Sequence, residues 1–566
     1  MLRSLFRKKS IDKIIKDAEQ GLAESHEPGG LHKILTVRDL TFMGIAAIVG
    51  AGIFSTIGTA AFNGGPGISL LFVITAVTCG FSALCYAEFA SRVPIAGSAY
   101  TYAYVSFGEI IAWIIGWALI LEYAIGNIVV AISWSGYFNN LLEVVGVRFP
   151  AWLTTDPATA RSAFHEAQAA LTAGQPLNKS LQFAHDAWTN APVVGGYHVF
   201  MNIPAFLIVV LITWLTYIGI RESKKSTNVM VIFKLGVIVF VIILGFFSVD
   251  PHNWSPFMPN GFEGVLKGVS AVFYAYIGFD AISTTAEECK NPQHDLPRGM
   301  INSLIICTVL YILIALVLTG MVSYKELNVI DPLAEVFEKT GQGWIAYIVS
   351  ISAVIATTSV LLVFQLGQPR IWMSMSRDGL LPKAFSKIHH KYKTPSFASV
   401  ATGVLVAIPT LFVQSSLMVD LTSIGTLFAF ILVSGGVLLL PRLDNSIKRG
   451  FKLPYINGQF IVPVIYFIFV YLFRERIGKV FMNFGKDNLQ EILFIIFLIE
   501  GAVLALFTFL RRYSLIPIMG VLFCSYLLIE IPAKSWIWFL GWMAGGLCIY
   551  FLYSYRNSKL KVKSEK

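Results

Sequence analysis

Two apolar segments, far apart in the sequence, are each interrupted near the middle. Residues 41–65 (TFMGIAAIVGAGIFSTIGTAAFNGG) are long enough to cross a bilayer, but a Gly-Ala-Gly tripeptide at 50–52 breaks the run. Glycines at that depth allow a helix to unwind, and the freed N–H and C=O groups then need partners in a protein-lined cavity. Residues 269–292 (VSAVFYAYIGFDAISTTAEECKNP) repeat the pattern around Gly278 and Asp280. Paired discontinuous helices indicate the binding site of a secondary transporter, so we expect a carrier.

The composition also indicates a membrane protein. Of the residues, 56% are hydrophobic and 13% are charged, and the mean hydropathy is +0.69. Soluble globular proteins have about 25% charged residues. Because a span needs about 20 mainly apolar residues, we predict an all-α integral membrane protein with fourteen spans. The predicted spans are 39–63, 67–91, 108–140, 199–220, 227–248, 264–287, 299–322, 343–372, 396–413, 417–441, 459–475, 489–510, 514–531 and 535–555.

The distribution of basic residues predicts the orientation. Fourteen spans place both termini on one side, and most of the 43 Lys and Arg residues fall on that side. Because basic loops remain in the cytoplasm, both termini are predicted to be cytoplasmic. The basic loop at 474–486 falls on the other side and is the exception. The net charge of +10 reflects this bias and does not indicate a nucleic-acid partner.

Five regions make up the predicted organisation. They are a cytoplasmic N-terminal segment (1–38), a ten-helix transport core (39–441) with an extracytoplasmic loop (141–198), four additional membrane helices (459–555) and a basic cytoplasmic tail (556–566). The first segment has no signal peptide, and it is either a basic amphipathic helix on the inner leaflet or a solvated tail. The long loop is helix-prone, and it either caps the outer vestibule or is an insertion without function. The cysteines lack a CxxC pair, so we expect packing roles and no metal site.

Three motifs make the chain recognisable. GAGIF in the first span, FYAYIGFDAISTTAEECKNPQHDLPRG around the sixth and GQPRIWMSMSRDGLLPKAF after the eighth resemble the amino acid-polyamine-organocation superfamily, in its cationic amino acid transporter branch. The resemblance implies a five-plus-five inverted repeat with helices 1 and 6 broken, and four extra C-terminal helices. It implies a cell-membrane permease that takes up amino acids, often with protons, and that needs no cofactor. Membrane lipids, and a small single-span membrane partner or an oligomer, are the other partners to expect.

The two breaks predict a substrate site made of backbone. The N-terminal end of a half-helix has free N–H groups and a partial positive charge, which suit a carboxylate. The candidates are the N–H groups of Gly50, Ala51 and Gly52. By resemblance, the carbonyls that receive the substrate ammonium are those of Ile48, Tyr274, Ala275 and Ile277. Tyr274 also matches the position of a gating aromatic in relatives, and the alternative for the glycines is a kink for close helix packing.

Lys234 is the single residue that most strongly indicates a function. A Lys near the middle of a span costs about 2.5–3.5 kcal/mol to insert, so it is expected to face a cavity or a partner. By resemblance, its amine replaces the sodium ion of coupled relatives. Because desolvation disfavours the charged form of a lysine, we expect its protonation to change during alternating access. The alternative is a lysine that snorkels to the interface. Lys234 lies about 15 Å along a helix from Lys224 and Lys225, which is far for snorkelling.

Four acidic residues complete the candidate site. Glu122 is a buried ionisable group that, by resemblance, links proton and substrate binding, whereas Asp280 is expected to hold the broken sixth helix by hydrogen bonds. Glu287 and Glu288 lie at the inner end of that helix. They are predicted to be a cytoplasmic gate or a solvated helix end.

Phe364 leads to a prediction about the substrate. By resemblance, members that transport arginine have a small residue here, and an aromatic ring fills the space that a long cationic side chain needs. Residues 343–376 contain neither Asp nor Glu to compensate a guanidinium, so the expected substrate is a small or medium neutral amino acid such as alanine. The alternatives are an exchanger, a cationic amino acid transporter and a non-transporting sensor. No GxSxG, HExxH or phosphate-loop motif indicates an enzyme.

Overall fold

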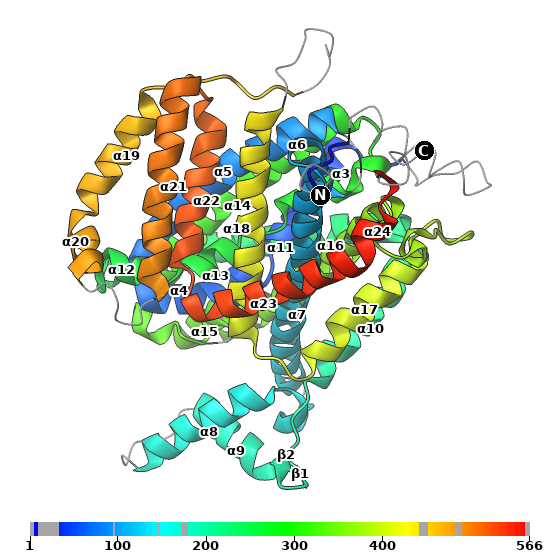
Figure 1. Ribbon diagram of the computed structural model, residues 1–566. Helices are drawn as coiled ribbons and strands as arrows, with labels where there is room; N and C mark the ends of the chain where they lie inside the picture. The colour runs from blue at the N-terminus through cyan, green and yellow to red at the C-terminus, as the bar shows by residue number, and fades with distance from the viewer. Residues whose placement is uncertain are drawn as a thin grey trace.

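The computed structural model is a bundle of helices from which one insertion projects (Figure 1). The structure describes residues 5–9, 33–93, 95, 97–144, 146–172, 179–329, 331–440, 451–482 and 489–560. The predicted amphipathic helix falls mostly on residues 10–32, which lie outside the described residues. Both ends of the described chain lie at one end of the bundle, opposite the insertion (Figure 1). We call that end the terminal face.

The first half of the bundle begins at a capped helix. The Asp39 carboxylate accepts the backbone N–H of Thr36 at 3.0 Å, which fixes the start of α3. The elements of this half are α3 (Val37–Ile48), η1 (Gly52–Thr56), α4 (Ile57–Gly64), η2 (Gly65–Gly67), α5 (Ile68–Arg92), α6 (Ser98–Ser106), α7 (Glu109–Val144), α10 (Ile203–Ile218) and α11 (Ile220–Phe246). Asn202 caps α10 by accepting the N–H of Ala205 at 3.2 Å.

The second half repeats a short, broken first element. Its elements are η4 (Pro251–Trp254), α12 (Gly261–Leu266), α13 (Val269–Tyr274), η5 (Phe279–Glu288), α14 (Pro292–Met321), η6 (Tyr324–Glu326), α15 (Pro332–Lys339), α16 (Gly343–Arg377), η7 (Lys383–Ser386), α17 (Ser396–Thr410) and α18 (Ser415–Leu439). Pro292 begins α14, because proline is favoured in the first turn of a helix. The broken elements lie at the centre, where α3 and η5 pack against each other and against α14 and α16.

The C-terminal helices pack onto this bundle. They are α19 (Ile461–Leu472), α20 (Arg474–Met482), α21 (Leu489–Arg511), α22 (Leu515–Glu530), α23 (Ala533–Ile549), η8 (Tyr550–Ser554) and α24 (Tyr555–Asn557). α22 packs on α18, and α19 and α21 pack on α22. Trp542 of α23 stacks on Trp117 of α7 with ring centroids 4.7 Å apart, and each indole N–H donates to the other residue's carbonyl.

The long loop forms a small unit that projects from the bundle (Figure 1). Its elements are η3 (Ala151–Leu153), α8 (Pro157–Thr172), α9 (Lys179–Asn190) and the antiparallel strands β1 (Val193–Val194) and β2 (Tyr197–His198). Trp188 stacks on Phe164 and Phe200 with ring centroids 5.5 Å away in both cases. The unit therefore has a small core of its own and extends away from the bundle.

The helices have the properties of membrane spans. In the described part of the chain, eight helical stretches are long and apolar enough to cross a membrane, and four shorter apolar helices accompany them. The predicted count of fourteen is not confirmed, because the first two predicted spans run on as one helical stretch (Val37–Arg92) and the sixth is interrupted. Large apolar side chains such as Trp214 and Phe247 are exposed on the outside. A surface of this kind is expected where lipid is the solvent.

Candidate functional site

Both predicted breaks are present in the backbone. α3 ends at Ile48, and the chain turns at Val49 (φ −81°, ψ 97°) before η1 begins as a π-helix at Gly52. In the second half α13 ends at Tyr274, and Gly278 has a φ of +118° before η5 continues as a 3₁₀-helix. Only glycine adopts that φ without strain.

The two breaks lie against each other. A Cβ added to Gly52 would overlap the backbone of Ala275, and one added to Gly278 would lie 2.7 Å from the Cβ of Ala47. The Thr56 hydroxyl donates to the carbonyl of Ala271 at 3.1 Å and joins the two broken elements further along. Glycine is therefore needed at both breaks so that the two backbones can meet.

A cavity of about 10 Å³ lies between the breaks, which is room for about one water molecule. It is lined by Ala47, Ile48, Gly50, Ala51, Gly52, Val130, Tyr274, Ile277, Val360 and Phe364. The structure thus brings together all the predicted substrate residues except Ala275, which packs on Gly52. None of the lining residues is charged. In this conformation the cavity is too small to hold an amino acid.

Backbone groups are available in the cavity as the breaks predict. Among the described residues, none accepts a backbone hydrogen bond from the N–H of Gly50 or Ala51. The Ile48 carbonyl already accepts the hydroxyl of Tyr311 at 2.8 Å. A carbonyl oxygen has two lone pairs, so Ile48 retains capacity for a second donor.

Tyr274 and Phe364 close the cavity toward α7. The Tyr274 hydroxyl donates to the carbonyl of Gly126 at 3.4 Å. The Phe364 ring lies 5.4 Å from the ring of Tyr123 and is only 4% exposed, so it faces the interior of the bundle and not lipid. A Cβ on Gly126 would come within 3.0 Å of that ring. The absence of a side chain at Gly126 on α7 therefore leaves the space that the Phe364 ring fills.

Lys234 of α11 is fully buried at the end of α3. Its Nζ donates to the carbonyls of Val49 (2.7 Å) and Ala46 (3.1 Å) and to the Ser359 hydroxyl of α16 (2.9 Å). The ammonium thus binds carbonyl groups that the break in α3 releases. The snorkelling alternative is wrong for this conformation, because the side chain points into the bundle.

Glu122 of α7 and Asp280 of η5 are buried close to one another. Asp280 accepts the Tyr123 hydroxyl at 3.5 Å, and Thr426 lies within hydrogen-bonding reach of Glu122. One carboxylate oxygen of each acid has no hydrogen-bond partner among the described residues. Each acid therefore keeps an acceptor oxygen that a water molecule or a neighbouring donor can fill.

Glu287 and Glu288 are held by arginines of α16. Arg370 donates to the Glu288 carboxylate at 2.6 Å, and Arg377 donates to both oxygens of Glu287 at 3.0 and 3.2 Å. The alternative of a solvated helix end is wrong, because the two glutamates are 8% and 1% exposed. We call these two pairs the ion-pair gate. They join η5 to α16 on the side of the cavity nearer the terminal face.

Sequence reasoning missed the partners of these residues. Arg370 and Arg377 lie seven residues apart, so they occupy one face of a helix two turns apart, and this spacing could have suggested the pairing. Ser359 and Tyr311 carry no comparable signal, because a Ser hydroxyl in an apolar helix usually bonds to its own backbone and a Tyr there is usually a packing residue.

Comparison with known proteins identifies the family to which the chain belongs. The profile of the amino acid permease family matches residues 35–499, and the profile of the C-terminus of such permeases matches residues 513–558. The chain belongs to the amino acid permease family. It is therefore a multi-pass membrane protein of a transporter family and not an enzyme.

Relatives in this family match the whole chain. The chain is 38% identical to the branched-chain amino acid permease BcaP and 35% identical to the methylthioribose transporter of Bacillus subtilis (strain 168), and each alignment covers 99% of this chain and 100% of the relative. It is 30% identical to the mitochondrial cationic amino acid transporter 3 of Arabidopsis thaliana, over 99% of this chain and 96% of the relative. The resemblance to the superfamily and its cationic branch is thus confirmed.

Proposed function

We propose that this chain is a proton-coupled permease that moves small or medium neutral L-amino acids, such as alanine, across the cell membrane by alternating access. The observation that carries the proposal is a closed cavity between two broken helices, lined by free backbone N–H groups and apolar side chains without a charge. The N–H groups suit an α-carboxylate and the carbonyls suit an α-ammonium. The apolar wall suits an uncharged side chain.

The specificity rests on Phe364. A guanidinium against this ring would lose hydration with no carboxylate among the cavity residues to compensate it, and an unpaired buried ion is costly. The name of the branched-chain permease relative supports a neutral substrate, whereas the name of the Arabidopsis relative supports the cationic alternative. The methylthioribose relative is named for a solute that is not an amino acid. The requirement for the amino and carboxyl groups of the substrate therefore needs a test of its own.

Proton coupling is assigned to Lys234 and Glu122. Lys234 bridges α3, α11 and α16, so loss of its proton would free the carbonyl groups of α3. Glu122 has an acceptor oxygen without a partner and lies near Asp280, which we propose to be structural. Glu287 and Glu288 are proposed as the gate on the cytoplasmic side. An exchanger uses the same site without net proton movement and is the alternative.

The architecture proposed for this function has two inverted halves of five helices. The broken element that opens each half supports the repeat, with α3, η1 and α4 in one and α12, α13 and η5 in the other. Fourteen spans, a core over 39–441, four further helices over 459–555 and termini in the cytoplasm remain part of the proposal. So does a small membrane partner or an oligomer.

Counterflow in proteoliposomes tests the proposal. Vesicles loaded with alanine should take up labelled alanine, and an imposed pH gradient, acidic outside, should drive accumulation above equilibrium. Exchange that is unaffected by the gradient would establish the exchanger instead. Arginine, lysine and decarboxylated analogues should fail to displace labelled alanine, and Phe364→Ser should admit arginine. Displacement by arginine at the same concentration as alanine would contradict the neutral specificity.

A further inference from the structure

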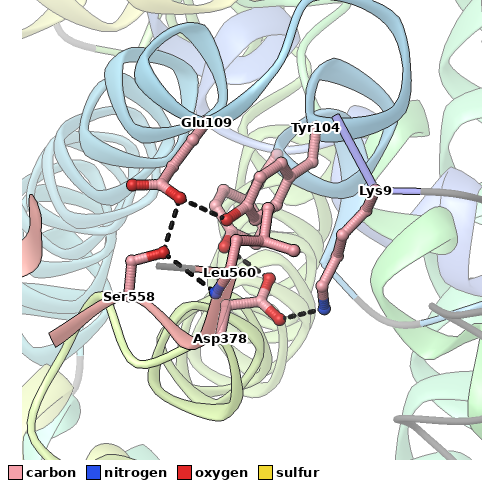
Figure 2. A network of polar contacts seen from close by, with 7 residues as sticks. Lys9, Tyr104, Glu109, Asp378, Ser558 and Leu560 are labelled. Carbon is pink, nitrogen blue, oxygen red and sulfur yellow. Dashed lines mark hydrogen bonds and ion pairs between the residues drawn. The ribbon is translucent and has the colours of Figure 1, made fainter. Parts of the chain in front are cut away.

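Two carboxylates outside the candidate site hold the two ends of the chain (Figure 2). Glu109, the first residue of α7, accepts three hydroxyl groups. They come from Tyr104 of α6 (3.0 Å), Tyr550 of η8 (3.0 Å) and Ser558 beyond α24 (2.5 Å). Glu109 and Ser558 are fully buried. The carboxylate therefore fastens the C-terminal segment to the start of α7.

Asp378 fastens the other end of the chain. It follows the last residue of α16 and forms an ion pair with Lys9 (Figure 2). It also accepts the Tyr100 hydroxyl at 2.6 Å. Lys9 is 5% exposed, which is unusual for a lysine in a terminal segment. The Asp378 carbonyl also accepts the backbone N–H of Lys559 at 3.1 Å. The first and last described segments of the chain thus meet at one residue.

The two terminal segments also touch the core and each other through backbone and rings. The N–H of Glu109 donates to the carbonyl of Arg7 at 3.0 Å, and the Arg7 guanidinium lies 5.8 Å from the centre of the Tyr555 ring. A Cβ on Gly108 would lie 2.6 Å from the Phe6 carbonyl carbon, so a glycine is needed beneath the N-terminal segment. We call residues 6–9 and 554–560, seated on Glu109 and Asp378, the terminal clasp.

The terminal clasp adjoins the ion-pair gate. Asp378 is the next residue after Arg377, which binds Glu287. Just before α3, the backbone N–H of Leu35 donates to the carbonyl of Glu288 at 3.0 Å. The end of α16 is thereby tied on one side to the gate and on the other side to both termini.

We propose that the terminal clasp is a latch that holds the ion-pair gate closed and whose release lets the cavity open toward the terminal face. Opening there requires η5 and α3 to separate from the end of α16. The clasp fixes that end to α6 and α7 through buried polar contacts, and a buried carboxylate that loses its cation is unfavourable. The inference concerns gating and stands whichever solute the protein carries.

A native cysteine reports on the gate. Cys289 directly follows Glu288, is fully buried and donates its thiol to the carbonyl of Thr285 at 3.3 Å. Its reaction with maleimide therefore requires the gate to open. Cys307, in the middle of α14, is equally buried and serves as the internal control for general loosening.

The experiment measures maleimide labelling of the purified full-length protein in detergent, by peptide mass spectrometry. Lys9→Met breaks the ion pair but keeps the Tyr100–Asp378 bond, and Ser558→Asp places a second carboxylate against Glu109. The matched control is Lys339→Met, which breaks ion pairs with Glu326 and Glu335 at the end of α15 and touches no residue of the clasp. Two independent variants keep the test informative if one fails to fold.

Lys9→Met and Ser558→Asp should each raise the labelling rate of Cys289 at least threefold over the wild type. Cys307 should label at the wild-type rate, as should Cys289 in Lys339→Met. Wild-type labelling of Cys289 in the folded clasp variants would overturn the latch. Equal acceleration at Cys307 would also overturn it, since the clasp would then stabilise the whole bundle and not the gate.

Discussion

Lys234 illustrates how one side chain can stabilise a broken helix. The turn after α3 releases carbonyls that would otherwise bind N–H groups one turn later, and the ammonium supplies two of the missing donors. Ser359 holds the same ammonium from α16. The lysine thus couples the first broken element to two other helices, and its charge state affects all three.

Lys234→Ala should abolish proton-driven accumulation while the protein still folds. Each of the carbonyls of Ala46 and Val49 would lose its charged donor, at a cost of about 1–3 kcal/mol per buried group, which a bundle of this size can tolerate. Uptake under an imposed pH gradient, together with the thermal unfolding midpoint, measures both effects. Ser359→Ala is the control, because it leaves both carbonyls bound and should retain accumulation. Unchanged accumulation in Lys234→Ala would remove the lysine from the coupling mechanism.

At the scale of elements, α16 connects the parts of the site. Along one helix it contributes Ser359 to the ammonium, Phe364 to the cavity, and Arg370 and Arg377 to the ion-pair gate. η5 has buried acids at both of its ends, Asp280 and Glu288. A shift of η5 relative to α16 therefore changes the cavity and the gate together.

Arg370→Ala should destabilise the protein by about 3–5 kcal/mol, because Glu288 is left as an unpaired charge in the interior. Adding Glu288→Gln should recover most of this loss, since the neutral amide needs no cation. Unfolding of the purified single and double variants measures the difference. A double variant as unstable as Arg370→Ala would mean that the arginine acts by packing and not by charge.

Asp331 should make stability depend on pH at the end of α7. It lies in the connection before α15 and accepts Asn140 at 2.6 Å. Burial of the carboxyl is the main cause that raises the pKa of Asp331 from 3.8 to about 6. The folded protein then holds a proton between those values that the unfolded chain has lost. The free energy of unfolding therefore falls as pH rises from about 4 to about 6, by at most about 3 kcal/mol.

Asp331→Asn should remove this slope. Thermal unfolding midpoints at pH 4.5 and pH 7 measure it, as the difference between the wild type and the variant. Glu326→Gln, at an exposed ion pair in the same connection, is the matched control and should keep the slope. An identical pH dependence in wild type and Asp331→Asn would show that the carboxyl has no raised pKa.

At the scale of the whole molecule, the insertion and the bundle have separate cores. The bundle buries the broken elements, whereas the insertion packs Trp188 between Phe164 and Phe200. Stability in such a molecule is not uniform, because each core opens with its own free energy.

Trp188→Ala should therefore expose the insertion to proteases without changing the unfolding midpoint of the bundle. The lost ring contacts loosen α8 against α9, and no residue of the cavity or gate is involved. Limited proteolysis, with cleavage mapped to residues 146–198, and thermal unfolding of the same sample measure the two cores. A lowered midpoint of the bundle would mean that the insertion supports it.

Local patterns predicted the breaks well. The glycines at 50–52 and Gly278 marked where the helices end, and the isolated charge of Lys234 marked a buried partner. These signals lie within one turn of the feature they predict. The helix-prone loop likewise forms α8. The number of spans was harder to predict from the sequence, because one helical stretch (Val37–Arg92) runs through the predicted boundary at 64–67.

Partners distant in sequence were not predictable in this way. Glu287 and Arg377 are 90 residues apart, and Lys234 and Ser359 are 125 residues apart. Such pairs depend on the packing of helices, and no periodicity in either segment specifies it. The role of Glu109 is a further example, since nothing near it in sequence indicates that three hydroxyls surround it.

The bond between Ser558 and Glu109 has a consequence for biosynthesis. The two residues are separated by 449 positions, so the ribosome makes Glu109 long before it makes Ser558. Until then only one of the three hydroxyls that surround this carboxylate, that of Tyr104, has been made, and the two missing hydrogen bonds are a local defect. A chain cut short before η8 would keep that defect permanently. Tyr550 and Ser558 thus complete, late in synthesis, a buried site that the start of α7 sets up early.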